Sequence, residues 1–199
     1  MNAVLLFGGL ISILNQTLLA PALPSIMKEM QIDASLAQWL TTGFMLVNGI
    51  MIPVTAFLID RFSTRTLFFA SMGIFTLGTV LCGMATSFPV ILLARMLQAA
   101  GAGVMMPMGQ TIMLLTLPRQ YRGVGMGFIG LIMGFAPAIG PVIAGLIVDA
   151  FNWHVLFYGI APLAALTIVV AYFYLENLGE STIIKLDKPS VLLSSLGFG

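Results

Sequence analysis

The stretch at residues 91–108, ILLARMLQAAGAGVMMPM, places one permanent positive charge, Arg95, inside a run that is otherwise apolar, small or uncharged. A guanidinium in hydrocarbon is costly unless it faces a water-filled cavity or a polar partner. We therefore treat Arg95 as a functional residue, and we predict a bundle of helices around a cavity that Arg95 faces.

The composition of the chain indicates a membrane protein. Hydrophobic residues make up 59% of the 199 residues, charged residues make up 8%, and the mean hydropathy is +1.07. A soluble domain of this length cannot bury so much apolar surface. The net charge of +1 offers no basic surface, so we expect no nucleic-acid partner.

Short charged clusters divide the sequence into six apolar runs, each long enough to cross a bilayer, which takes about 20 residues. The six predicted spans are 4–25, 37–59, 66–86, 89–117, 123–148 and 155–175. The predicted fold class is all-α and integral to the membrane, with a six-helix transmembrane bundle in residues 1–175. Residues 176–189 are predicted as a cytoplasmic linker, and residues 190–199 as the start of a seventh span that is cut off. We therefore expect the chain to be the front part of a longer protein.

The distribution of basic residues predicts the orientation in the membrane, because cytoplasmic loops carry an excess of Lys and Arg. The loops on one side hold Arg61, Arg65, Arg119, Arg122, Lys185 and Lys188. The loops on the other side hold only Lys28. We predict a multi-pass protein of the cell membrane whose N-terminus is cytoplasmic. The loops are too short for a soluble domain, so the activity must lie within the spans.

Polar residues stand out in the first and fourth spans. Asn15, Gln16 and Thr17 are consecutive, and in lipid such groups must find hydrogen-bond partners across a helix interface. Gln98 follows Arg95 by three residues and shares its helix face. Two interpretations remain open. These groups form interhelical hydrogen bonds only, or they solvate the Arg95 guanidinium and line a substrate cavity.

The fifth span is patterned with small residues and prolines. Small residues recur every four positions on two faces of this span, as Ala136, Gly140 and Ala144 and as Gly130, Gly134 and Ala138. Such spacing allows another helix to approach closely. Pro137 and Pro141 should kink or stiffen the helix. A plain packing face and a moving interface are both consistent with the pattern.

These residues resemble the major facilitator superfamily, and within it the 14-span drug:proton antiporter branch of the EmrB and QacA type. The resemblance covers nearly the whole chain, in five segments in the family's order: LNQTLLAPALP (14–24), AFLIDRFSTR (56–65), ARMLQAAGAG (94–103), GPVIAG (140–145) and NWHVLFYGIAP (152–162). The second segment resembles the loop signature between spans two and three through Leu58, Asp60, Arg61 and Arg65. The fourth segment resembles the span-five antiporter motif through Gly140, Pro141 and Gly145. The fold implied is the amino-terminal half of a major facilitator protein.

The departures from the family pattern concern the coupling site. The acidic residue of the family's first span is Asn15 here, and no Asp or Glu lies inside any of the six predicted spans. Proton antiport needs a group that loads and releases a proton within the cavity, usually a buried carboxylate. We therefore expect the coupling carboxylate after Gly199, or a coupling that differs from the family pattern.

The function implied by the resemblance is secondary active transport, with multidrug efflux by proton antiport and antibiotic resistance in a bacterial plasma membrane. The implied partners are a lipophilic small molecule, protons, the bilayer and a C-terminal half. We expect no cofactor or metal, and no enzyme, because the spans hold no pair of acids and no cluster of His or Cys. The alternatives are an importer or facilitator of a small metabolite or anion, and a non-transporting scaffold bundle. The 199-residue chain alone is expected not to transport, since one face would lack its partner.

Overall fold

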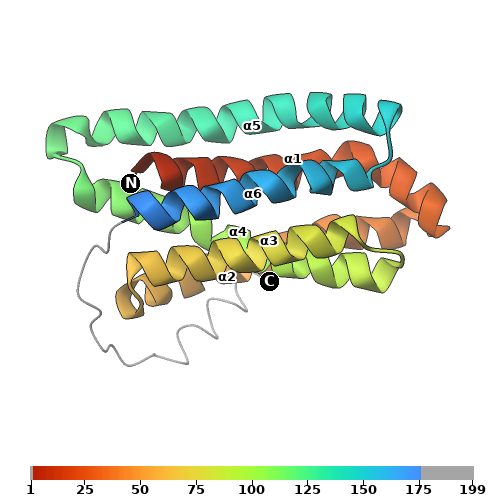
Figure 1. Ribbon diagram of the computed structural model, residues 1–199, viewed down its shortest axis with the longest axis horizontal. Helices are drawn as coiled ribbons and strands as arrows, with labels where there is room; N and C mark the ends of the chain where they lie inside the picture. Colours follow the sequence, from red (N-terminus) through yellow and green to blue (C-terminus); the bar gives the residue numbers. More distant parts are fainter. Residues whose placement is uncertain (1, 176–199) are drawn as a thin grey trace.

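The computed structural model describes residues 2–175, which fold into six long helices joined by short turns (Figure 1). The helices are α1 (Asn2–Met30), α2 (Ala34–Arg61), α3 (Thr64–Gly83), α4 (Phe88–Thr116), α5 (Arg122–Ala150) and α6 (His154–Tyr174), with a short 3-10 helix, η1 (Arg119–Tyr121), before α5. All six are long and apolar enough to cross a membrane. The prediction of an all-α membrane protein with six spans is therefore confirmed. The predicted linker at 176–189 and the predicted start of a seventh span at 190–199 lie outside the described residues.

Side chains in the turns determine where the helices begin. Asp33 accepts a hydrogen bond from the backbone nitrogen of Leu36 at 2.7 Å and caps α2. Ser63 accepts one from the backbone nitrogen of Thr66 at 3.2 Å and caps α3. Such caps pair backbone N–H groups that have no partner within the helix. The short turns bring successive helices back across the bundle in alternate directions.

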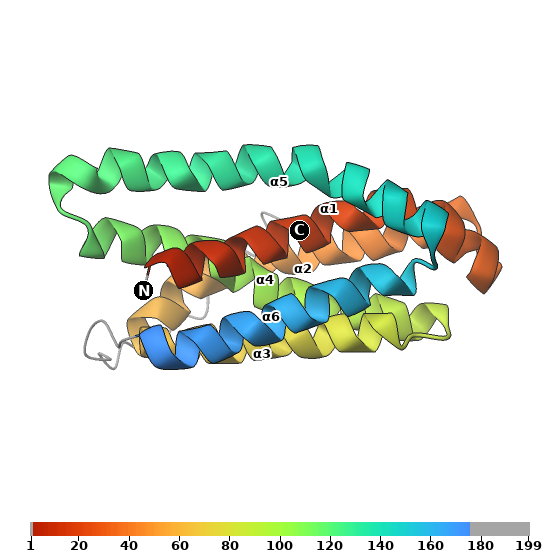
Figure 2. The ribbon, with the colours of Figure 1, turned by 45° about the horizontal axis from the view of Figure 1, so that its top comes forward.

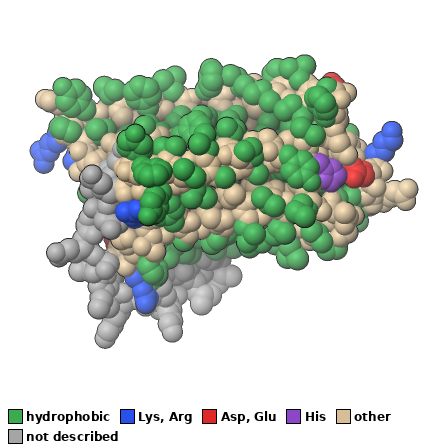
Figure 3. Space-filling view, in the orientation of Figure 1, with side chains coloured by type: hydrophobic (Ala, Val, Ile, Leu, Met, Phe, Trp, Pro, Cys, Tyr) green, Lys and Arg blue, Asp and Glu red, His purple; other side chains and the backbone are tan. Residues whose placement is uncertain are grey.

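The charges of the described residues are separated along the bundle. The N-terminus, the α2–α3 turn and the α4–α5 turn lie at one end, which we call the basic end (Figures 1 and 2). Lys28 lies in the last turn of α1, at the opposite end. Figure 3 shows hydrophobic side chains along the bundle and charged ones at its two ends. This separation fits the predicted orientation, and the cytoplasmic location of the basic end stays a prediction.

Helix α4 is central to the bundle, because it contacts α1, α2, α3 and α5. Its approach to α3 depends on Gly101, which is buried. A Cβ atom at Gly101 would overlap the Ser71 carbonyl oxygen and lie 2.7 Å from the Phe75 backbone nitrogen. The two helix backbones therefore touch directly. This contact places the polar residues of α4 against those of α3.

The α3–α4 contact yields a test of the packing. Gly101→Ala should lower the thermal unfolding midpoint in detergent, because overpacking against backbone costs about 1–3 kcal/mol. Gly109→Ala, in the same helix, is the matched control, since a Cβ atom there has no neighbour within 4 Å among residues 2–175. The control should leave the midpoint unchanged or raise it slightly, as alanine favours a helix over glycine by about 1 kcal/mol. Equal midpoints for the two variants would contradict the close contact.

Candidate functional site

Arg95 is held by uncharged groups. It lies about two turns into α4 and is 1% exposed. Its Nη1 donates a hydrogen bond to Gln98 Oε1 at 2.9 Å, and its guanidinium carbon lies 4.3 Å from the ring centroid of Phe44 in α2. A cation over a ring face is attracted by the ring's quadrupole. Arg95 Nε has no hydrogen-bond partner among residues 2–175. The charge is thus stabilised by an amide oxygen and an aromatic face.

Gln98 connects Arg95 to two further helices. Its Nε2 donates a hydrogen bond to Thr79 Oγ1 of α3 at 2.9 Å and lies 3.5 Å from Asn15 Oδ1 of α1. Cys82 of α3 is also close, with its sulfur 3.5 Å from Gln98 Oε1. All these side chains are buried. We call this set the Arg95 cluster, and it consists of Arg95, Gln98, Asn15, Thr79, Cys82 and Phe44.

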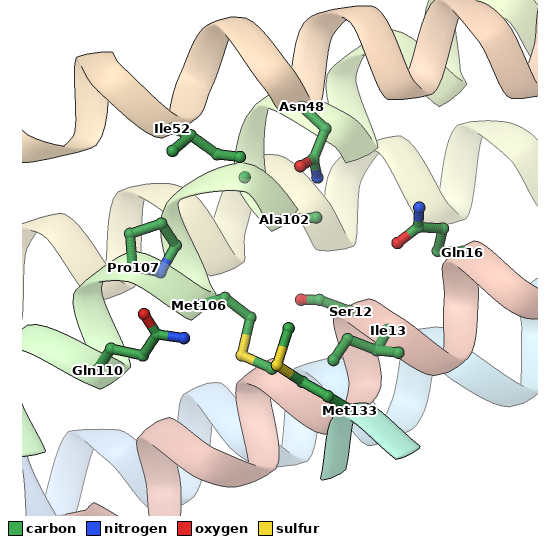
Figure 4. Close-up of a pocket in the computed structure, with 11 residues that line it drawn as sticks. Ser12, Ile13, Gln16, Asn48, Ile52, Ala102, Met106, Pro107, Gln110 and Met133 are labelled. Atoms are coloured by element: carbon green, nitrogen blue, oxygen red, sulfur yellow. The ribbon is translucent and has the colours of Figure 1, made fainter. Parts of the chain in front are cut away.

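A cavity of about 300 Å³ lies beside the Arg95 cluster, between α1, α2, α4 and α5 (Figure 4). Gln16, Asn48 and Ala102 line it from the middle of their helices, so the cavity lies near the middle of the bundle. Asn48 follows Phe44, and Ala102 follows Gln98, by one helical turn. Four polar side chains line the cavity: Ser12, Gln16, Asn48 and Gln110. The rest of the wall is apolar or small and consists of Ile13, Ile52, Ala102, Gly103, Met106, Pro107 and Met133.

The structure divides the residues predicted to line a cavity into two places. Gln16 lines the cavity, whereas Asn15, Arg95 and Gln98 pack together one turn away. In this conformation the guanidinium faces protein side chains instead of the cavity, because Gln98 and Phe44 fill the space beside it. Thr17 lies outside both groups, since its hydroxyl donates to the Leu14 carbonyl oxygen at 2.9 Å. A transport role for these residues stays a prediction.

Sequence reasoning missed three of the four polar residues of the cavity: Ser12, Asn48 and Gln110. The criterion applied to the first span, an amide side chain within an apolar run, was available for Asn48 and Gln110 as well. Asn48 has no charged or polar neighbour in the sequence, and Gln110 has one polar neighbour, Thr111. Neither lies beside a charge, so neither was singled out.

The two small-residue stripes of α5 have different surroundings. Ala136, Gly140 and Ala144 are buried, and a Cβ atom at Gly140 would overlap the Thr17 hydroxyl of α1. This stripe packs inside the bundle, as the plain packing interpretation predicts. In the second stripe, Gly130 and Gly134 are exposed, and no heavy atom of the described residues lies within 4 Å of a Cβ atom built there.

The rest of the span-five antiporter motif lies at the surface of the described bundle. Pro141 is exposed, and Gly145 is partly exposed, with open space around it among residues 2–175. α5 is helical throughout, across both Pro137 and Pro141. The motif therefore spans an internal contact at Gly140 and an open face at Pro141 and Gly145. Its role as a moving interface stays a prediction.

Arg65 of the loop signature connects the start of α3 to the end of α6. Arg65 Nη2 donates a hydrogen bond to the Tyr172 carbonyl oxygen at 3.1 Å, in the last turn of α6, where a cation is favoured by the helix dipole. Arg61 lies 5.8 Å from the ring centroid of Phe57. Asp60 is exposed and has no hydrogen bond or ion pair within residues 2–175. The side chain that caps α3 is Ser63, and a role for Asp60 stays a prediction.

At the opposite end, Trp153 fixes the start of α6 against α1. The side chain is fully buried, and its Nε1 donates a hydrogen bond to Glu29 Oε2 at 2.7 Å. His154 stacks on Trp153 with a centroid distance of 3.6 Å. Its Nε2 also lies 3.2 Å from the Ala85 carbonyl oxygen, beyond the end of α3. Helices α1, α3 and α6 are therefore tied together at this end.

Comparison with known proteins gives consistent matches over the whole bundle. The sequence profile of the Major Facilitator Superfamily matches residues 5–196. The chain is 51% identical over 196 residues to the MFS-type transporter YcnB of Bacillus subtilis, covering 98% of this chain and 42% of YcnB. It is 43% identical over 195 residues to the lincomycin resistance protein LmrB of Bacillus subtilis, covering 98% of this chain and 41% of LmrB.

A more distant relative is the multidrug export protein EmrB of Haemophilus influenzae, which is 31% identical over 189 residues, covering 94% of this chain and 37% of EmrB. The chain thus spans about two fifths of the length of the curated relatives it matches. Among solved structures, a crystal structure of the peptide transporter POT in complex with sulfate matches with a TM-score of 0.80 and 15% identity, covering 98% of this chain and 43% of that chain. At that identity the likeness is one of fold.

The Arg95 cluster predicts a specific pattern of stabilities. Gln98→Leu should lower the free energy of unfolding by about 3 kcal/mol, because it leaves the buried guanidinium without an acceptor. Thr79→Val should cost only about 1 kcal/mol, the net value of one neutral hydrogen bond. The double variant Arg95→Leu/Gln98→Leu should be more stable than Gln98→Leu alone, since the unpaired charge is gone. Denaturant unfolding in mixed micelles measures all three, and a double variant less stable than Gln98→Leu would contradict the assignment.

Proposed function

The chain belongs to the Major Facilitator Superfamily, and we propose from that membership that it forms the amino-terminal bundle of a secondary active transporter that exports several small molecules by proton antiport. The observation that carries the proposal is the cavity near the middle of the bundle, with four polar side chains in an otherwise apolar wall. Such a site at mid-membrane suits a substrate that is exposed alternately to the two sides. Relatives named for lincomycin resistance and multidrug export support efflux as the direction.

A second bundle is the proposed partner of the open side of this one. Ile52 of α2 and Met133 of α5 line the cavity and are each 52% exposed, so the cavity opens between these two helices. α5 also exposes large apolar side chains, including Leu131 at 65% and Leu146 at 67%. A second bundle over α2 and α5 would close the cavity and cover this surface. Rocking of the two bundles would then open the site to alternate sides of the membrane.

The proposed proton carrier lies outside the described bundle. The acidic residues of residues 2–175 are all at helix ends: Asp33 caps α2, and Glu29, Asp60 and Asp149 are each second to last in their helices. Asn15, at the position of the family's acid, cannot exchange a proton in this way. A carboxylate of the second bundle would therefore load the proton, and Arg95 would supply a fixed positive charge near it.

A second candidate function is a facilitator or importer of a small anion or metabolite. It is favoured by the Arg95 guanidinium, which has no carboxylate partner in the described part of the chain. Such a transporter would move its substrate without a proton gradient. The family is one of transporters, and we propose no enzymatic activity.

Transport in liposomes tests the proposal. The chain, together with any sequence that follows Gly199 in the gene, is reconstituted with an imposed pH gradient, and lincomycin or chloramphenicol is added. Antiport predicts that each substrate accelerates the collapse of the gradient, and that Arg95→Leu reduces this effect at least about tenfold. Arg119→Leu, at the surface of the basic end, is the matched control and should leave the rate unchanged.

Two outcomes would contradict the proposal. Substrate movement that continues unchanged after a protonophore removes the gradient would favour the facilitator. Efflux by residues 1–199 alone, at the rate of the longer protein, would refute the need for a second bundle.

A further inference from the structure

The cavity contains three carboxamide side chains without partners. Gln16, Asn48 and Gln110 line it, and none of the three side chains has a hydrogen bond to another residue in 2–175. Ser12 differs, because its hydroxyl donates to the Gly8 carbonyl oxygen at 2.9 Å. All three side chains are partly exposed in the cavity, so their N–H and C=O groups are free to pair with water or with a ligand that enters it. A ligand that displaces this water must replace its hydrogen bonds, because a polar group that loses them without compensation costs free energy.

These three carboxamides come from three helices and converge on one space. Figure 4 shows Gln16 of α1, Asn48 of α2 and Gln110 of α4 around the cavity, with Met106 and Met133 between them. Each carboxamide offers two N–H donors and one oxygen acceptor. The two methionines offer a flexible, polarisable apolar surface. A matching ligand has an apolar body and carries both donors and acceptors.

The electrostatics of the cavity disfavour a cation. None of the described residues that line it is charged or aromatic. A lipophilic cation is bound by a carboxylate or by an aromatic face, and this wall offers neither. Phe44, one helical turn before Asn48 on α2, already has the Arg95 guanidinium over its ring. The fixed charge of Arg95, about two helical turns from Ala102 along α4, repels a second positive charge.

We infer that this cavity selects uncharged amphipathic molecules that carry amide or hydroxyl groups, and that it discriminates against lipophilic cations through Gln16, Asn48 and Gln110. The inference rests on the proposed function, since it names the substrate class of the proposed transport site. It restricts the expected substrates of the transporter to uncharged amphipathic compounds.

Equilibrium binding without any gradient tests the inference separately from proton coupling. The protein with any sequence that follows Gly199 is purified in detergent, and two probes of similar size are compared: chloramphenicol, which is uncharged and bears an amide and two hydroxyls, and the cation tetraphenylphosphonium. Wild type should bind chloramphenicol more tightly. Asn48→Leu and Gln110→Leu should each weaken chloramphenicol binding about tenfold, the effect of one lost hydrogen bond to the ligand.

Two further variants make the test specific. Gln38→Leu, which removes an exposed carboxamide of α2 outside the cavity, is the matched control and should leave chloramphenicol binding within about twofold. Gln110→Glu keeps the side chain's size and adds a carboxylate, so it should raise the affinity for tetraphenylphosphonium and reverse the preference. Thermal midpoints in the same detergent show that each variant is folded.

Tighter binding of tetraphenylphosphonium by wild type, no binding of chloramphenicol, or chloramphenicol binding that survives both leucine variants would each overturn the inference. Failure of the proposed function gives a different result, namely the predicted binding profile without movement of chloramphenicol driven by a pH gradient in liposomes.

Discussion

A buried guanidinium that has no carboxylate partner within residues 2–175 is the constraint on which the rest of the structure depends. The charge of Arg95 is stabilised by the Gln98 side-chain oxygen, one turn further along α4, and by the Phe44 ring of α2. Helix α2 must therefore pack directly against α4. Gln98 in turn needs Thr79 of α3 as an acceptor. That contact requires the backbones of α3 and α4 to touch, which is possible because residue 101 is glycine. The position of α4 at the centre of the bundle follows from these requirements.

The same arrangement keeps the charge away from the cavity. The Arg95 cluster and the cavity are adjacent along α1, α2 and α4, but the cluster is packed and the cavity is open between α2 and α5. The bundle therefore has a fixed charge and a separate, uncharged cavity. The proposed second bundle would cover the cavity without touching the buried guanidinium, so a carboxylate there would experience the field of Arg95 while the proposed substrate contacts Gln16, Asn48 and Gln110.

The sequence predicted the six spans and the shared helix face of Arg95 and Gln98. It did not predict which side chains lie in the cavity and which are buried, because that depends on how the helices pack. Six apolar runs predicted six helices to within a few residues, because length and apolarity suffice for that. The spacing of Arg95 and Gln98 predicted their shared face, but the period of a helix does not say whether that face meets water or another side chain. The two stripes of α5 are equivalent in sequence, and only contact with Thr17 distinguishes the one that contains Gly140. Asn48 and Gln110 come together across helices, which no local pattern records.

The most direct test of this account compares the thiol accessibility of two positions, Cys82 in the Arg95 cluster and residue 48 in the cavity wall. Cysteines outside residues 1–199 are replaced by serine, and a charged, water-soluble thiol reagent is applied either to Cys82 or to Asn48→Cys in a Cys82→Ser background. Cys82 is fully buried in the Arg95 cluster, whereas Asn48 lines the open cavity. The account predicts fast labelling at position 48 and none at Cys82 on the same timescale. Equal labelling rates at the two positions would show that water reaches the Arg95 cluster, and would contradict the separation of the charge from the binding cavity.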